Sequence, residues 1–285
     1  MKTAFVFAGG GSLGAVEVGM LQALVGREPT PDFVAGSSVG AINAAYFAAR
    51  PDAEGVARLA AIWRRLRSRD VFPLKPLHGF LGFIGRRPSL LDAEPLRALL
   101  ERELPYRLFE EAALPCHVVA TDVLDGGRVV ISKGPVVDAL LASAAIPGVF
   151  PPRRCGDKQL IDGGVSANTP LAAAVERGAR RIVVLPTGFS CALPEPPSGA
   201  LAMALHAITL LVARQLVSDV LHFQDRAEIF VVPPLCPIES SAYDFSASAA
   251  LIDRAAANTE AWIATRGLER PGVPHALAQH THELF

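Results

Sequence analysis

Short apolar runs open the chain, and each ends in a glycine turn that leads into an apolar or amphipathic helical stretch. Residues 2–8 and 31–36 have the continuous apolar character of buried strands, and residues 14–25 and 39–49 have helical periodicity. Strand, tight turn and helix in repeated order are typical of βαβ units. This part of the chain therefore predicts the start of a parallel sheet with helices packed on it.

The middle of the chain makes the predicted sheet mixed. Residues 115–121 and 128–132 resemble strands, and an Asp-Gly-Gly turn signal at 125–127 separates them, so we expect an antiparallel hairpin. One proline at a first helical turn and another after a helix end indicate a helix over residues 135–146. Further helices are expected over residues 51–68 and over residues 92–104, the second with Asp92 as its cap.

The remaining elements complete a three-layer architecture. A strand at 159–162 enters a third glycine turn, strands follow at 181–186 and 228–232, and helices follow at 169–178, 199–223 and 246–266. Together the elements predict an α/β fold, a three-layer α/β/α sandwich with a mainly parallel, mixed central sheet. We expect a single domain over residues 1–270 and a C-terminal tail over residues 271–285.

The composition excludes some classes of function. The chain of 285 residues has a formal net charge of -1, a pI near 6.7 and 19% charged residues, so no nucleic acid partner is expected. Hydrophobic residues make up 51% of the chain, which suggests apolar helices on a sheet and some surface for lipid. His206 interrupts the most apolar stretch and Arg214 ends it, so no membrane-spanning segment is expected.

The cysteine and histidine patterns indicate neither a metal nor a cofactor. The four cysteines are far apart and form no C-x-x-C pair, which is typical of reduced structural thiols in a cytoplasmic protein. They are Cys116, Cys155, Cys191 and Cys236. The histidines have no metal-ligand spacing, and His280 and His282 lie in a polar tail. The apolar stretch at the N-terminus is too short for a signal peptide, so we interpret it as the first strand.

The stretch GSSVG between the second strand and the second helix holds two candidate nucleophiles, Ser37 and Ser38. The residues two positions from Ser38 are Gly36 and Gly40, whereas the preceding serine has alanine and valine there. A nucleophile on a strand-to-helix elbow needs both glycines because the backbone passes close on either side. Ser38 fits, and the helix N-terminus would favour an oxyanion beside it. A flexible turn with a serine cap is the alternative reading.

The first glycine turn has two readings. Gly9, Gly11 and Gly14 have the G-x-G-x-x-G spacing of dinucleotide-binding turns. A ribose-binding acid is then needed at the end of the second strand, but the nearest one, Asp32, lies at its start. We therefore interpret the backbone amides of Gly9, Gly10 and Gly11 as an oxyanion hole. A tight turn for close helix packing is the alternative.

The third glycine turn supplies a candidate base. Asp162 precedes Gly163 and Gly164 at a strand end, at the edge of the sheet where Ser38 is expected. No histidine lies in a catalytic motif: His206 and His222 fall in an apolar helix and His275 in the tail. We expect a Ser38–Asp162 dyad, in a site desolvated enough to raise the aspartate pKa above about 3.9. An aspartate that bonds its own turn is the alternative.

In this order, the motifs G-G-G-x-x-G, G-x-S-x-G and D-G-G resemble the patatin-like phospholipase family. The stretch ASAAIPGVFPP at 142–152 is similar to the family's segment before its D-G-G turn, and the likeness covers about residues 2–185. It implies calcium-independent hydrolysis of phospholipid, lysophospholipid or related lipid esters, with Ser38 as nucleophile, Asp162 as base and an acyl-enzyme intermediate. Many members carry Arg or Lys where this chain has Leu13, so any contribution of that cation is in doubt.

Residues 70–91 form an apolar segment rich in proline and glycine, without a convincing period. We hypothesise a mobile cover that accepts acyl chains or touches a membrane surface, with Arg86 and Arg87 near head groups; a loop packed on the core is the alternative. The apolar side chains of this cover are Phe72, Leu77, Phe80, Leu81, Phe83 and Ile84. The protein is then expected to be cytoplasmic and peripheral to a membrane.

Two other functions stay open at this stage. One is an acyltransferase that uses acyl-CoA or acyl carrier protein; such enzymes resemble G-H-S-x-G, and here Ser37 occupies the position of that histidine. The other is a non-catalytic nucleotide-binding module built on the turn at 9–14. The sequence predicts no head group, acyl-chain length or oligomeric state.

Overall fold

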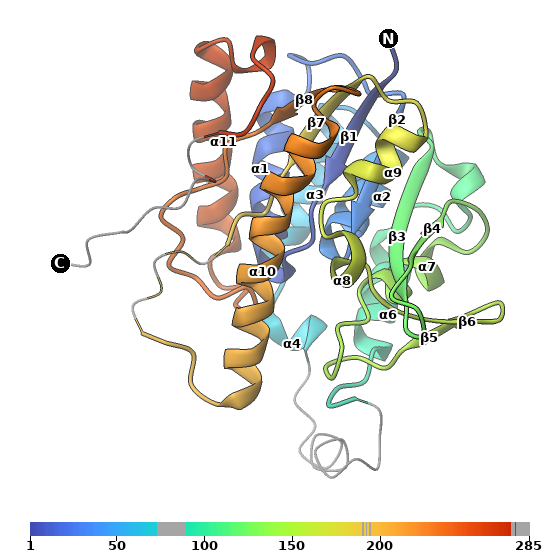
Figure 1. The fold of residues 1–285 in the computed structure, drawn as a ribbon. Coiled ribbons are helices and arrows are strands. Elements are labelled where there is room, and N and C mark those ends of the chain that lie inside the picture. Colours follow the sequence, from blue (N-terminus) through green and yellow to red (C-terminus); the bar gives the residue numbers. More distant parts are fainter. Residues whose placement is uncertain (73–88, 190, 192, 194, 275–276, 278–285) are drawn as a thin grey trace.

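The structure is a computed structural model of residues 1–285, and it describes all of them except 73–88, 190, 192, 194, 275–276 and 278–285. A mixed sheet lies between two layers of helices (Figure 1). Its strands are β1 (Thr3–Phe7), β2 (Phe33–Ser37), β3 (Cys116–Asp122), β4 (Arg128–Ile131), β5 (Arg153–Cys155), β6 (Lys158–Asp162), β7 (Arg181–Leu185) and β8 (Glu228–Val231). They follow the order β5-β6-β3-β2-β1-β7-β8, with β4 also paired to β3.

Parallel pairing joins the central strands β3, β2, β1, β7 and β8. The pairs β3–β4, β3–β6 and β5–β6 are antiparallel. The predicted α/β fold with a mainly parallel, mixed sheet is confirmed, and the hairpin predicted around residues 125–127 is the β3–β4 pair. The single domain over residues 1–270 stays a prediction.

Helices cover both faces of the sheet. The helices are α1 (Gly14–Leu24), α2 (Val39–Ala49), α3 (Ala53–Arg65), α4 (Ser68–Val71), α6 (Glu94–Glu103), α7 (Val136–Ser143), α8 (Gly164–Ala167), α9 (Leu171–Glu176), α10 (Ala200–Phe223) and α11 (Ser248–Ala264). Alternate residues of β1 pack on opposite layers, because side chains of a strand point to alternate faces. Phe5 and Phe7 join the core under α1, α2 and α11, and Ala4 and Val6 join the core under α9 and α10.

The observed elements differ from the prediction mainly in length and in short pieces. The predicted helix over 92–104 begins at Glu94, so its N-cap is Ala93 and the prediction of Asp92 as the cap is wrong by one residue. The Asp92 carboxylate nevertheless accepts a hydrogen bond from the Glu94 N–H over 3.1 Å. The strand β5 and the helices α4 and α8 were not predicted. Three or four residues show too little periodicity for a sequence pattern to identify them.

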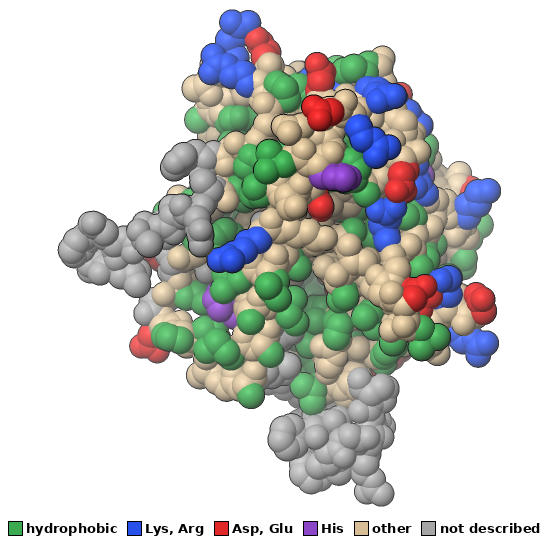
Figure 2. Space-filling model, in the orientation of Figure 1, with side chains coloured by type: hydrophobic (Ala, Val, Ile, Leu, Met, Phe, Trp, Pro, Cys, Tyr) green, Lys and Arg blue, Asp and Glu red, His purple; other side chains and the backbone are tan. Residues whose placement is uncertain are grey.

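The helix α10 packs on one face of the sheet and leaves much of its own surface exposed. Its C-terminal half packs Leu216, Val220 and Phe223 against the core. Within the described residues, the segment 202–223 of this helix is long and apolar enough to cross a membrane, by length and composition only. Only 12% of its most apolar part is buried inside the protein. Figure 2 shows hydrophobic side chains over the lower part of this face, where the N-terminal half of α10 lies.

Candidate active site

The elbow between β2 and α2 carries Ser38. Its backbone has φ 53° and ψ -127°, a region that residues other than glycine rarely adopt. Such strain is typical of a nucleophile held on a strand-to-helix turn. The Ser38 N–H donates to Ser143 Oγ over 2.8 Å, and the Ser143 hydroxyl donates to the Val119 carbonyl over 2.5 Å. The elbow is therefore fixed from both α7 and β3.

The two adjacent serines have different surroundings. Ser37 is fully buried, and its Oγ has no hydrogen-bond partner among the described residues, whereas Ser38 is 7% exposed and lines a cleft. A Cβ on Gly36 would lie 2.6 Å from a backbone nitrogen of α2, and one on Gly40 would lie 2.6 Å from a backbone oxygen of β1. The two glycines therefore permit the sharp turn that presents Ser38, and not Ser37, to the cleft.

The sheet brings Asp162 to the same place. β3 pairs with β2 as far as the Ser37–Val119 position and with β6 from the Ala120–Asp162 position onward. β4 overlaps both of these partners along β3, so it occupies the opposite edge. β2 and β6 therefore follow each other along one edge of β3, and their C-terminal ends meet there.

At this junction Ser38 Oγ donates a hydrogen bond of 2.6 Å to Asp162 Oδ2. The other carboxylate oxygen, Oδ1, accepts the Gly164 N–H over 2.7 Å. Burial raises the pKa of Asp162 to about 6, although the hydrogen bonds from Ser38 and Gly164 act in the lowering direction. The pKa of Asp162 is thus raised in the direction that a desolvated site predicts.

The D-G-G turn has little room for side chains. A Cβ on Gly163 would lie 2.5 Å from Ser37 Oγ, and one on Gly164 would lie 2.9 Å from Asp162 Oδ1. The Thr121 hydroxyl donates to the Asp162 carbonyl over 2.8 Å and so fixes the end of β6 to β3. Larger residues at the two glycines would move the carboxylate away from Ser38.

The first glycine turn lines the cleft together with Ser38 and Asp162. The Gly9 N–H donates to the Asn168 carbonyl over 2.9 Å, so this amide is engaged within the fold. The N–H groups of Gly10 and Gly11 make no hydrogen bond to the described residues. Of the three amides predicted for an oxyanion hole, these two are the ones left for a ligand.

Two side chains from distant parts of the chain, which no sequence motif indicated, hold this turn. Thr187 Oγ1 donates to the Gly9 carbonyl over 2.8 Å, and Asn168 Nδ2 donates to the same oxygen over 3.2 Å. They follow β7 and α8, far from the turn in sequence, so no local motif identifies them. Gly14 begins α1, and the neighbouring Leu13 is fully buried in the core.

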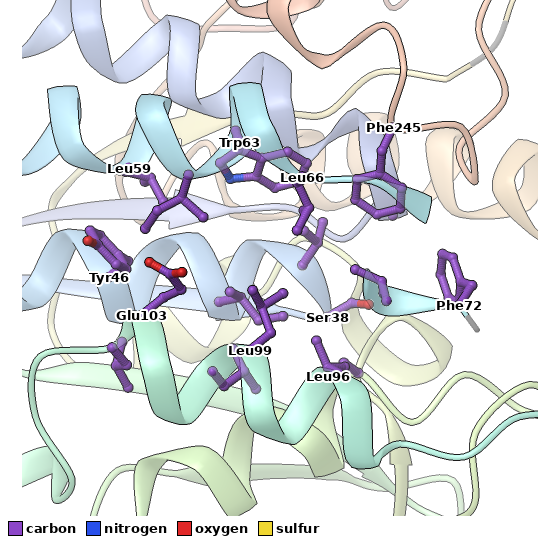
Figure 3. A pocket seen from close by; sticks show the side chains of 18 of the residues that line it. Ser38, Tyr46, Leu59, Trp63, Leu66, Phe72, Leu96, Leu99, Glu103 and Phe245 are labelled. Carbon is purple, nitrogen blue, oxygen red and sulfur yellow. The ribbon is translucent and has the colours of Figure 1, made fainter. Parts of the chain in front are cut away.

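Two clefts meet at Ser38, and Figure 3 shows the first. The first, of about 790 Å³ with its open mouth included, runs between α2, α3 and α6 and is almost entirely apolar. The second, of about 690 Å³, holds the glycine turn, Asp162 and side chains of α10. Among the described residues that line them, Glu103 is the charged residue of the first cleft and Asp162 that of the second. No histidine lines either cleft within the described part of the chain.

The predicted cover at 70–91 is described only at its two ends. Phe72 lines the first cleft, and its ring centroid lies 5.6 Å from that of Phe150 and 5.8 Å from that of Tyr243. The other apolar residues of the cover, with Arg86 and Arg87, lie outside the described residues.

The described residues offer no group of three or more His, Cys, Asp or Glu side chains that could hold a metal ion. Within the described residues no disulfide joins the cysteines, and Cys191 Sγ donates to Cys236 Sγ over 3.9 Å. The junction of the clefts brings together the Ser38 hydroxyl, the Asp162 carboxylate and the backbone amides of the first glycine turn.

Sequence comparison relates the chain to a known family. The family profile described as patatin-like phospholipase matches residues 5–175. An uncharacterized NTE family protein of Mycobacterium tuberculosis is 34% identical over 173 residues, which cover 60% of this chain and 45% of that protein. Patatin-like phospholipase domain-containing protein 6 of Mus musculus is 26% identical over 188 residues, which cover 65% of this chain and 13% of that protein. The chain thus spans less than half the length of these relatives.

Solved structures show weaker similarity. VipD from Legionella pneumophila has a TM-score of 0.48 at 15% identity, covering 93% of this chain and 67% of that one. Human GIVD cytosolic phospholipase A2, in complex with methyl gamma-linolenyl fluorophosphonate, has a TM-score of 0.45 at 13% identity, covering 94% and 58%. The family profile, in contrast, covers more than half of the chain and includes all three glycine motifs. The chain belongs to the patatin-like phospholipase family.

Proposed function

We propose that this protein is a serine acyl-ester hydrolase that acts on phospholipids, lysophospholipids or related lipid esters. The observation that carries the proposal is the 2.6 Å hydrogen bond from Ser38 Oγ to Asp162 Oδ2 at the junction of two apolar clefts. Membership of a phospholipase family supports the reaction class. Ser38 is then the nucleophile and Asp162 the general base.

The first half of the reaction forms an acyl enzyme. Asp162 accepts the Ser38 proton while Oγ attacks the ester carbonyl, and the electron pair of the carbonyl bond moves to its oxygen. The N–H groups of Gly10 and Gly11 would stabilise that oxyanion. When the carbonyl reforms, the bond to the alcohol oxygen breaks, and the proton on Asp162 passes to that oxygen.

The second half uses water in the same geometry. Asp162 accepts a proton from the water molecule that attacks the acyl-enzyme carbonyl, and the amides of the glycine turn again face the oxyanion. Collapse breaks the bond to Ser38 Oγ, which recovers its proton from Asp162 and releases a carboxylic acid. An alkoxide leaves more readily than an amine would, so an ester suits this site better than an amide.

We also propose that the protein works in transient contact with a lipid surface. Large apolar side chains on the outside of α10 are exposed: Met203, Ile208, Leu210, Leu211 and Leu221. Ile208 also lines the second cleft, so the exposed face of the helix continues into the site. An apolar surface at the mouth of a lipid-binding cleft favours direct passage of substrate from a membrane.

The proposal is tested by ester turnover with matched variants. The purified protein should hydrolyse p-nitrophenyl butyrate and a lysophospholipid, whereas Ser38→Ala and Asp162→Asn should lose turnover at least about a hundredfold. Ser37→Ala is the matched control and should keep most of the activity, because Ser37 does not face the cleft. Equal activity in Ser38→Ala and the wild type would refute the proposal.

The same assay separates hydrolysis from acyl transfer. With water alone as acceptor, a hydrolase turns over continuously. An acyltransferase stops after one acyl group per chain until a thiol or an alcohol is added. Absence of both turnover and acylation would favour the alternative hypothesis, a non-catalytic nucleotide-binding module.

A further inference from the structure

The exposure pattern of α2 marks a path that begins at Ser38. Most residues of this helix are buried. The four that are only partly buried are Val39, Ile42, Tyr46 and Ala49. Their spacing of three, four and three residues places them on one face of the helix. This face is open because the first cleft runs along it, and the first three of these residues line that cleft.

The other walls of the cleft are apolar along most of its length. α3 contributes Leu59, Ile62 and Trp63, and α6 contributes Leu96, Leu99 and Leu100; Leu66 and Leu104, which directly follow these helices, also line the cleft. Figure 3 shows Ser38 near one end of this set and Tyr46 with Glu103 at the other. The cleft is therefore elongated, with the hydroxyl at its start.

Helix geometry gives the length of the path. Tyr46 lies eight residues after Ser38, and a rise of about 1.5 Å per residue places it roughly 12 Å farther along α2. An extended chain advances roughly 1.2 Å per bond, taken from about 3.6 Å for the three backbone bonds of a residue. The path from Ser38 to Tyr46 thus matches about ten carbons, and Ile42 lies about halfway.

The far end of the cleft is polar. The Glu103 carboxylate forms ion pairs with Arg65 over 2.6 Å and with Arg102 over 2.9 Å, and the Glu103 side chain is 15% exposed. The Arg65 pair joins α3 to α6 across this end. A methyl terminus that advanced beyond Tyr46 would meet these charged groups rather than gain apolar contact.

We propose that the acyl chain of the substrate lies along α2, that about ten carbons are held between Ser38 and Tyr46, and that Ile42 and the Tyr46–Glu103 end determine the acyl-chain length. This inference rests on the proposed hydrolase function. The alcohol half of the ester then occupies the second cleft.

The test compares p-nitrophenyl acetate, butyrate, octanoate, laurate and palmitate as substrates of wild type and Ile42→Phe. The larger ring blocks the path about halfway, so kcat/KM for octanoate and longer esters should fall at least tenfold, since each buried methylene contributes roughly fourfold. Acetate and butyrate should change less than about threefold, which also reports that the variant is folded. An unchanged chain-length profile in Ile42→Phe would overturn the proposal.

Two further variants test which of the two clefts holds the acyl chain and whether Glu103 ends its path. Val165→Phe places the same ring in the second cleft and should leave the shape of the chain-length profile unchanged, even if all rates move together. A profile truncated by Val165→Phe would place the acyl chain in the second cleft and overturn the proposal. Glu103→Leu extends the apolar wall and should raise the ratio of kcat/KM for palmitate to that for octanoate about fourfold or more. A lower ratio would contradict the claim that Glu103 limits the acyl-chain length.

Failure of the underlying function gives a different result. If wild type hydrolyses none of the esters and takes up no fluorophosphonate at Ser38, the hydrolase proposal fails. If wild type hydrolyses the short esters but its profile does not respond to Ile42→Phe, the chain-length proposal alone fails.

Discussion

At the scale of a single residue, the surroundings of the Asp162 carboxyl group determine whether it can act as a base. It is nearly buried, it is bonded to Ser38, and its pKa is raised to about 6. A base with this pKa is mostly ionised at neutral pH and is far stronger than an exposed aspartate. The residues around it thus give an ordinary side chain a function that its exposed form could not perform at the same pH.

The first prediction concerns pH dependence. Burial raises the pKa of Asp162, and only the ionised carboxylate can accept the Ser38 proton, so kcat/KM should fall as pH decreases through about 6. The measurement is the pH profile of kcat/KM for p-nitrophenyl butyrate in the free enzyme. A profile that stays flat down to about pH 4.5 would contradict Asp162 as the base.

The second prediction concerns stability and uses Asp162→Asn. The raised pKa means that the folded protein disfavours the ionised carboxylate, so this group lowers stability as pH rises from about 4 through about 6. Asparagine removes the charge and keeps an acceptor for the Gly164 N–H. At pH 8 the variant should be inactive, with a Tm equal to or above that of the wild type. A clear loss of Tm at pH 8 would show that the carboxylate stabilises the fold.

At the scale of elements, a buried side-chain network joins the helices around the site. Asn43 on α2 donates to the Gly14 carbonyl over 2.9 Å and to Glu17 Oε2 over 2.7 Å, both on α1. The indole N–H of Trp63 on α3 donates to Asn43 Oδ1 over 2.9 Å. Burial raises the pKa of Glu17 well above its usual value, although the hydrogen bond from Asn43 acts in the lowering direction.

The third prediction follows from this network. Asn43→Ala leaves buried donors and acceptors on α1 and α3 without partners, which should lower the free energy of unfolding by about 1–3 kcal/mol. Urea denaturation measures the change. Asn258→Ala is the matched control: Asn258 donates to the Pro233 carbonyl over 3.0 Å from a partly buried position, so a smaller loss is expected. Equal losses in the two variants would contradict a special role for the network.

The sequence predicted the elements that carry the motifs but not what holds them together. Ser38 was identified because an elbow requires glycine on both sides, and Asp162 because a D-G-G turn ends a strand. The succession of β2 and β6 along one edge of β3 was not predicted, since strand order depends on pairing between distant segments. Ser143, Asn168 and Thr187 were missed for the same reason: each acts through a contact with residues far away in the chain.

At the scale of the whole molecule, charge and apolar surface are unevenly distributed. The chain is nearly neutral, and on the face drawn in Figure 2 most charged side chains lie above and to the right of the apolar region around α10. Binding to a lipid surface through this region would depend on apolar contact more than on charge. Such binding should be nearly independent of ionic strength, because salt screens charges and does not weaken apolar burial.

The fourth prediction tests this surface. Leu211 is 69% exposed on α10, and Leu211→Asp should weaken binding to phosphatidylcholine vesicles at least about tenfold in a sedimentation assay, since burying one leucine contributes about 1.5–3 kcal/mol. Leu124, which is 90% exposed in the turn between β3 and β4, gives the matched control Leu124→Asp. Vesicle binding that both variants retain, or that both lose equally, would contradict docking through α10.

The most direct test of the central claim is to locate the acylated atom. The intact protein is treated with an alkyl fluorophosphonate, and the modified peptide is mapped by tandem mass spectrometry. The account predicts one adduct per chain, on Ser38, absent in Ser38→Ala and formed much more slowly in Asp162→Asn. An adduct on Ser37 or on another residue, or no adduct in a folded protein, would contradict it.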